Sequence, residues 1–85
     1  MEDGKIDGKE ATRKVKEYFD SIYQPLGAIG LQVKKVEFDE RIGNWIVDCS
    51  LFPYLGAQGR VEYRVEVNPF EGSIEKVSLL APSKP

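Results

Sequence analysis

The chain has 85 residues, a formal net charge of −2, no histidine and one cysteine. The missing histidine excludes Ser-His-Asp and Cys-His catalysis and histidine metal sites, and a lone cysteine excludes thiolate zinc sites and an intramolecular disulfide. We expect one domain over residues 1–85, with an ordered core at about 7–80 and flexible segments at 1–6 and 81–85.

Charge and hydropathy favour a cytoplasmic protein. Acidic and basic residues are mixed along the chain, so no basic face for nucleic acid is evident. The N-terminal stretch does not read as a signal peptide, and no apolar run is long enough to cross a bilayer. A single cysteine is typical of a reducing compartment. We therefore predict no nucleic-acid binding and no membrane insertion.

The first predicted element is a helix over residues 8–23. Asp7 is a suitable N-cap residue, and Glu10 follows at the capping-box spacing. Apolar side chains then recur at helical spacing along one stripe: Ala11, Val15, Tyr18, Phe19 and Ile22. Pro25 ends the helix.

The connection over residues 24–30 is apolar, with Leu26, Ala28 and Ile29. It either covers one end of the core or forms an exposed contact surface, and the sequence leaves both interpretations open. The first strand is predicted over residues 31–39. Its apolar residues are odd-numbered before Lys34-Lys35 and even-numbered after it, and this change in the alternation indicates a β-bulge in that strand.

A second strand is predicted over residues 44–52, and its odd-numbered residues should face the helix: Trp45, Val47, Cys49 and Leu51. Cys49 in this buried row is expected to behave as an inert apolar side chain. Ile46 and Phe52 fall on the nominally solvated face.

Strict alternation of apolar and charged residues over 60–67 predicts the third strand. The loop before it, over residues 53–59, is long and partly apolar. A turn at 68–72 leads to a last strand over 73–80. Short connections favour antiparallel pairing of sequential strands, and the helix covers their apolar face. The expected fold is therefore α+β, with one N-terminal helix packed on a four-stranded antiparallel meander (αββββ).

The pattern resembles the PepSY family and similar cystatin-like half-domains. In that pattern an aromatic residue opens one strand, the next reads Y-x-V-x-V, and a polar residue, a glycine turn and an I/V-x-x-V segment follow. The corresponding residues are Trp45, Tyr63, Val65, Val67, Asn68, Gly72, Ile74 and Val77. The match covers roughly residues 8–80, although the 53–59 loop is longer and more apolar than usual. The resemblance implies an inhibitory or regulatory binding module. Gas vesicle protein O has a similar layout, but its arginine- and tyrosine-rich ending is missing here.

The 53–59 loop and its neighbours are the main functional candidate, because aromatic side chains on an exposed apolar patch are typical interface anchors. The candidate interface residues are Phe52, Tyr54, Leu55, Leu26, Ile29 and Ile46. The alternative is that Tyr54 and Leu55 fold back over the open end of the core. The first or last strand could also accept a strand from a partner or from a second copy.

We predict a non-catalytic protein–protein interaction or regulatory module that binds a protein partner or a second copy of itself and requires no cofactor or metal. The alternative is a small-molecule-binding domain that uses the cleft between helix and sheet. A third hypothesis is an enzyme that uses a carboxylate pair, such as Asp48 beside Glu62, or the phenol of Tyr63.

Overall fold

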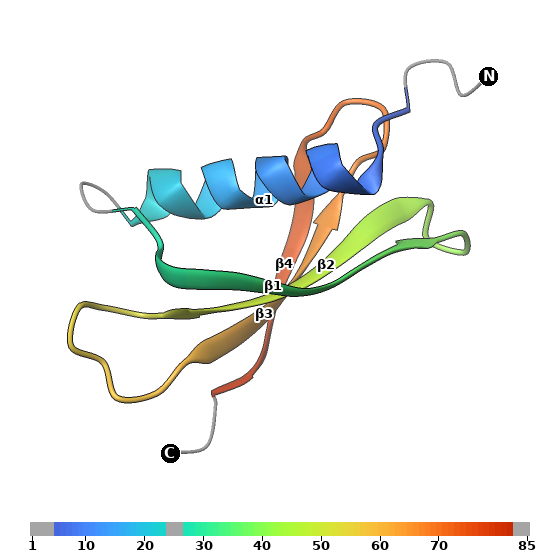
Figure 1. Ribbon diagram of the computed structural model, residues 1–85. Coiled ribbons are helices and arrows are strands. Elements are labelled where there is room, and N and C mark those ends of the chain that lie inside the picture. Colours follow the sequence, from blue (N-terminus) through green and yellow to red (C-terminus); the bar gives the residue numbers. More distant parts are fainter. Residues whose placement is uncertain (1–4, 24–26, 83–85) are drawn as a thin grey trace.

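One helix packs on a four-stranded sheet in the computed structural model, which describes residues 5–23 and 27–82 (Figure 1). The elements are α1 (Gly8–Ile22), β1 (Ile29–Asp39), β2 (Asn44–Phe52), β3 (Val61–Val67) and β4 (Ile74–Pro82). The strands lie in the order β1-β2-β3-β4, and each pairs antiparallel with the next. The predicted α+β fold with its αββββ order is confirmed.

Helix α1 begins and ends close to the predicted residues. Asp7 is the N-cap, and its Oδ1 accepts a hydrogen bond from the backbone N–H of Glu10 at 2.8 Å. Ala11, Val15 and Phe19 are buried, which follows from their spacing of four residues along one stripe. The helix ends at Ile22, and the N–H of Tyr23 still bonds to the carbonyl of Phe19.

The core lies between this stripe and the inward face of the two central strands. The buried side chains of the sheet are Val47, Cys49, Leu51, Val65 and Val67. Each fully buried apolar side chain of this size contributes about 1.5–3 kcal/mol to folding, so this layer dominates the stability of the domain. The predictions for the inward row of β2, including a buried Cys49, are confirmed.

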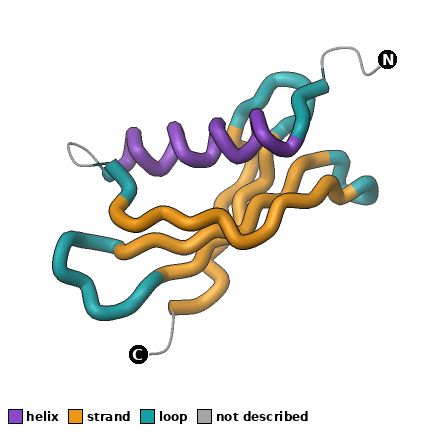
Figure 2. Tube along the Cα trace, in the orientation of Figure 1, coloured by secondary structure: helices purple, strands orange, loops and turns teal. Residues whose placement is uncertain are grey.

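Strand β1 starts two residues earlier than predicted, at Ile29. Its register against β2 shifts between Val33 and Lys35, so no residue of β2 lies directly opposite Lys34 in the sheet. The predicted β-bulge is therefore confirmed. The turns after β1 and β3 lie at one end of the sheet, whereas the connection before β1 and the loop before β3 lie at the other (Figure 2).

The structure describes part of each segment that was expected to be flexible, at residues 5–6 and 81–82. Ile6 is held by its backbone: its N–H donates to the carbonyl of Pro69 at 2.7 Å, and its own carbonyl accepts from Trp45 Nε1 at 3.0 Å. Strand β4 continues to Pro82, which pairs with Val61. Proline is tolerated there because β4 is an edge strand.

Candidate functional site

The two apolar connections meet at one end of the molecule. The register pairs Ile29 with Phe52, so the segment before β1 and the loop after β2 lie side by side. The C-terminus of α1, with Ile22, lies at the same end (Figure 1). We call this surface the apolar end and define it by Ile22, Ile29, Phe52, Tyr54 and Leu55. Leu26, also a predicted interface residue, lies outside the described residues.

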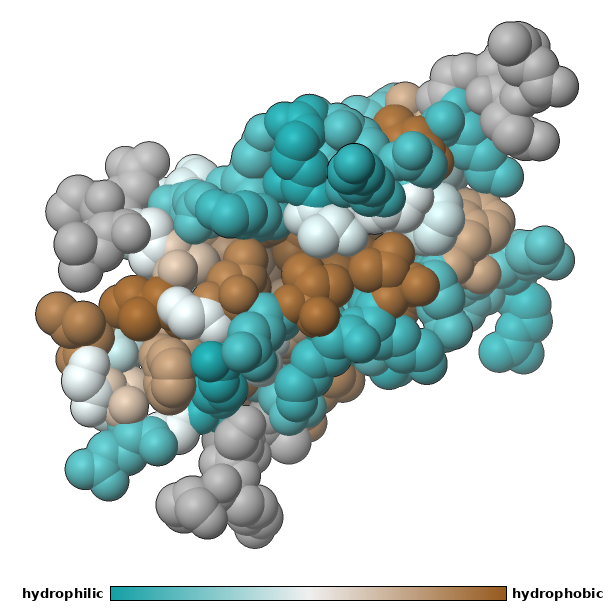
Figure 3. Space-filling view, viewed as in Figure 1, coloured by the Kyte–Doolittle hydropathy of each residue, from teal (hydrophilic) through white to brown (hydrophobic). Residues whose placement is uncertain are grey.

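The tip of the 53–59 loop points into solvent. Tyr54 is 65% exposed and Leu55 is 74% exposed, so neither side chain folds back over the core. In the sequence, residues 21–30 and 50–59 contain no Asp, Glu, Lys or Arg, although 31% of the chain is charged. Figure 3 shows apolar side chains gathered between α1 and β1 and toward this end, while polar side chains cover α1.

The base of the loop is fixed by Arg60, whose role the sequence did not predict. Its Nη1 donates to the carbonyl of Gly30 at 2.6 Å and to Ser50 Oγ at 3.2 Å. Its guanidinium lies over the ring of Phe52, 4.5 Å from the centroid. Phe52 is therefore a half-buried anchor of the loop rather than a fully exposed contact residue. The sequence feature that could have indicated this role is the position of Arg60, a cation that directly follows an uncharged loop with aromatic residues.

Ile46 is buried, contrary to the exposure that made it a predicted interface candidate. It lies on the face of the sheet away from α1, yet only 6% of its surface is exposed. The register places it between Glu37 on β1 and Glu66 on β3. Long charged side chains on neighbouring strands can cover an aliphatic residue with their stems, so alternation alone does not predict exposure.

The carboxylates proposed for catalysis are paired with separate cations. Asp48 accepts two hydrogen bonds from Arg64, at 2.8 and 3.0 Å, and this pairing lowers the pKa of Asp48. Glu62 instead bonds to Lys34 Nζ at 3.1 Å. Asp48 and Glu62 are diagonal neighbours on β2 and β3, and each carboxylate is bound to its own cation. The geometry is that of cross-strand charge pairing on a solvated sheet face.

The cleft between α1 and the sheet is filled where Phe19 lies. Its ring centroid is 5.3 Å from those of Tyr18 and Tyr63, and Phe19 is buried. A ligand at this point would have to displace core side chains. Cys49 is likewise a poor nucleophile, because burial raises the pKa of its thiol to about 11.

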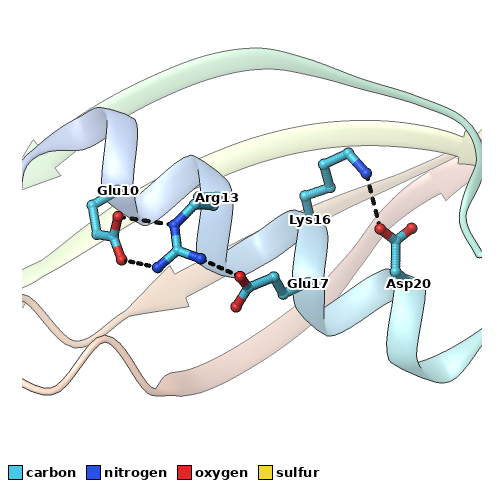
Figure 4. A network of polar contacts seen from close by, with 5 residues as sticks. All are labelled: Glu10, Arg13, Lys16, Glu17 and Asp20. Atoms are coloured by element: carbon cyan, nitrogen blue, oxygen red, sulfur yellow. Dashed lines mark hydrogen bonds and ion pairs between the residues drawn. The ribbon is translucent and has the colours of Figure 1, made fainter.

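The outward face of α1 carries ion pairs within the helix (Figure 4). Arg13 bonds to both Glu10 and Glu17, and Lys16 Nζ bonds to Asp20 at 2.9 Å. Asp20 also accepts a hydrogen bond from the N–H of Ala28 at 2.9 Å, which ties the helix to the chain entering the apolar end. This bond is the main reason that the pKa of Asp20 is lowered.

No helix within residues 5–23 or 27–82 combines the length and hydropathy needed to cross a bilayer. Over the same residues, no three Cys, Asp or Glu side chains converge in a way that could hold a metal ion. Comparison of the chain with protein-family models, with curated proteins and with solved structures gives no match.

Proposed function

We propose that this chain is a non-catalytic protein–protein interaction module and that the apolar end is its contact surface. The observation that carries the proposal is the exposure of Tyr54 and Leu55 on a loop whose base is fixed. Tyrosine is among the usual anchors of protein interfaces, and Leu55 adds exposed apolar area beside Tyr54.

The low charge of its two connections distinguishes this end from the exposed apolar positions of the two turns at the opposite end. At the opposite end Ile42 is 51% exposed and Phe70 is 64% exposed, but Arg41 and Glu71 flank them in the chain. The cores of protein interfaces are depleted in charged residues, because desolvating a charge opposes binding. Residues 21–30 and 50–59 have this composition, and the charged group beside them, the Arg60 guanidinium, is bound to Gly30 and lies over Phe52.

The resemblance to PepSY-like domains, regarded as inhibitory or regulatory binding modules, supports a binding function of the same kind. The filled interior of the helix–sheet cleft makes the apolar end a better candidate than a ligand cavity around Phe19.

Site-specific photo-crosslinking tests the proposal. A benzophenone amino acid replaces Tyr54 in one variant and Phe70 in a matched variant, and both are irradiated in lysate of the cells that naturally produce the chain. We expect one defined adduct from position 54 and none from position 70. An adduct of twice the chain mass identifies a second copy as the partner, and any other defined mass identifies a different protein.

A pair of double variants provides the control. Both variants are tested by affinity capture of the partner that the crosslinking identified, without a crosslinker in the chain. Tyr54→Ser with Leu55→Ser should abolish this capture, whereas Ile42→Ser with Phe70→Ser should retain it. Both pairs remove two exposed apolar side chains, so general loss of surface hydrophobicity is matched. Equal adducts from positions 54 and 70, or none from either, would contradict the proposal.

A further inference from the structure

An open hollow lies beside the chain entering α1, at the end of the domain away from the apolar end. Its volume is about 420 Å³, and it is lined by Lys5, Ile6, Asp7, Phe38 and Trp45. It shares no residue with the apolar end, so the inference drawn from it does not depend on the proposed function. Its volume falls within the range of small-molecule sites, about 300–1,000 Å³.

The aromatic walls of the hollow are held in place. Phe38 on β1 pairs with Trp45 on β2, and the two rings meet edge to face, 5.4 Å apart at 73°. The indole N–H of Trp45 is bound to the carbonyl of Ile6, which fixes the plane of the ring. The two rings therefore form a corner whose geometry is set by the sheet and by the backbone at Ile6.

A cation already lies in this corner. The ammonium nitrogen of Lys5 is 4.4 Å from the centroid of the Phe38 ring. A cation within about 6 Å of a ring face is attracted by the negative potential of the π-system. The carboxylate of Asp7, which caps α1, lines the same hollow and adds negative charge. An aromatic face, apolar walls and a nearby carboxylate are the chemistry that suits an organic cation.

We infer that the corner formed by Phe38 and Trp45 is a binding site for a small alkylammonium ion, with quaternary ammonium as the chemical class. The Lys5 ammonium is the internal stand-in for that ligand. The bound ion takes the place of Lys5 over the Phe38 ring, and its alkyl groups contact Trp45 and Ile6. Quaternary ammonium ions suit such a corner because they are weakly hydrated and need no hydrogen-bond acceptor.

The chain reports on this site directly because Trp45 is its single tryptophan. Choline is titrated into the full chain at constant ionic strength, and the indole N–H resonance and the fluorescence of Trp45 are followed. The neutral isostere 3,3-dimethyl-1-butanol is titrated in parallel. We expect saturable shifts with choline and an affinity about threefold or more above that of the alcohol.

Two variants test the roles of Lys5 and Phe38. Lys5→Met removes the internal competitor, so choline should bind about three- to tenfold more tightly than to the parent chain. Phe38→Leu removes the ring face, so the preference for choline over the alcohol should be lost while the circular dichroism spectrum is retained. Tyr54→Ser, at the distant loop, should leave both titrations unchanged.

Equal affinity for choline and the alcohol would overturn the assignment to cations. Absence of a saturable response to choline in both the parent chain and Lys5→Met would overturn the site itself. Should Phe38→Leu fail to fold, the comparison of the two ligands in the parent chain and in Lys5→Met still decides the question.

Discussion

The indole N–H of Trp45 donates a hydrogen bond to the carbonyl of Ile6, with 3.0 Å between nitrogen and oxygen. The N–H of Ile6 donates in turn to the carbonyl of Pro69 at 2.7 Å. Ile6, which precedes the N-cap of α1, is thus bound to β2 through its carbonyl and to the β3–β4 turn through its N–H. The backbone that leads into α1 is therefore fixed by the rest of the fold, and the Trp45 indole supplies one of its two attachments.

Replacing Trp45 by Phe should lower the free energy of unfolding by about 1–2 kcal/mol, because the Ile6 carbonyl loses its donor and part of the ring area is lost. Urea denaturation monitored by circular dichroism measures the change. Ile42→Ala, at an exposed hairpin position, should change the same quantity by less than about 0.5 kcal/mol. Similar losses in the two variants would contradict a specific role for the indole.

Gly30→Ala should be more destabilising than Gly43→Ala. Both glycines have positive φ, +63° and +82°, so each substitution costs about 1–2 kcal/mol of backbone strain. A Cβ at Gly30 would also lie 2.9 Å from Cδ2 of Phe52, whereas one at Gly43 would meet nothing within 4 Å. The steric clash should add about 1 kcal/mol or more at Gly30. Thermal and urea denaturation of the two variants measure the difference, and equal losses would rule out the contact with Phe52.

Asp48 should make stability depend on pH in the acid range. Its folded pKa is lowered by Arg64, below an unfolded value of about 3.9, so its contribution is complete above that value and is lost as the pH falls through the folded pKa. Asp48→Asn should therefore reduce the free energy of unfolding by about 1 kcal/mol at neutral pH. The gap between the variant and the parent chain should close below about pH 4. Urea denaturation across this range tests the trend, and a gap that does not change with pH would contradict it.

Cys49 should be unreactive in the folded chain. Burial raises the pKa of its thiol to about 11, so at neutral pH both access and the thiolate are lacking. Modification by an aromatic disulfide reagent should be roughly 100-fold slower or more in buffer than in denaturing urea, because it requires opening of the core. Rates of thiolate release in the two conditions give the ratio. A native rate close to the denatured rate would mean that the β2 row opens readily.

Periodicity predicted much of the fold because it records which face of an element is buried. The helix, the bounds of β2 and the bulge at Lys34 all follow from residues that point toward or away from one core. The position of Ile6 could not be predicted in this way, since its attachment uses backbone atoms that every residue carries. The extension of β4 to Pro82 was missed for a related reason. Proline argues against a strand unless the strand is known to lie at an edge.

The candidate site was predicted in part. The exposed loop tip at Tyr54 and Leu55 was identified because apolar residues are unusual in a loop. The burial of Ile46 was missed, because exposure on the outer face depends on where the long side chains of β1 and β3 extend. Arg60 was missed since its partners, Gly30 and Phe52, become neighbours only when β1 pairs with β2.

Register shifts interrupt both edge strands of the sheet. Strand β1 is interrupted at Lys34, and the register of β4 shifts between the partners of Glu62 and Tyr63 and again between those of Glu66 and Val67. A bulged edge cannot bond to a second strand along its whole length, so sheet extension from one molecule to the next is unfavourable. Growth into fibres is thereby opposed at both edges. Contact between the apolar ends of two copies would instead use the same surface on both molecules and would close at a dimer.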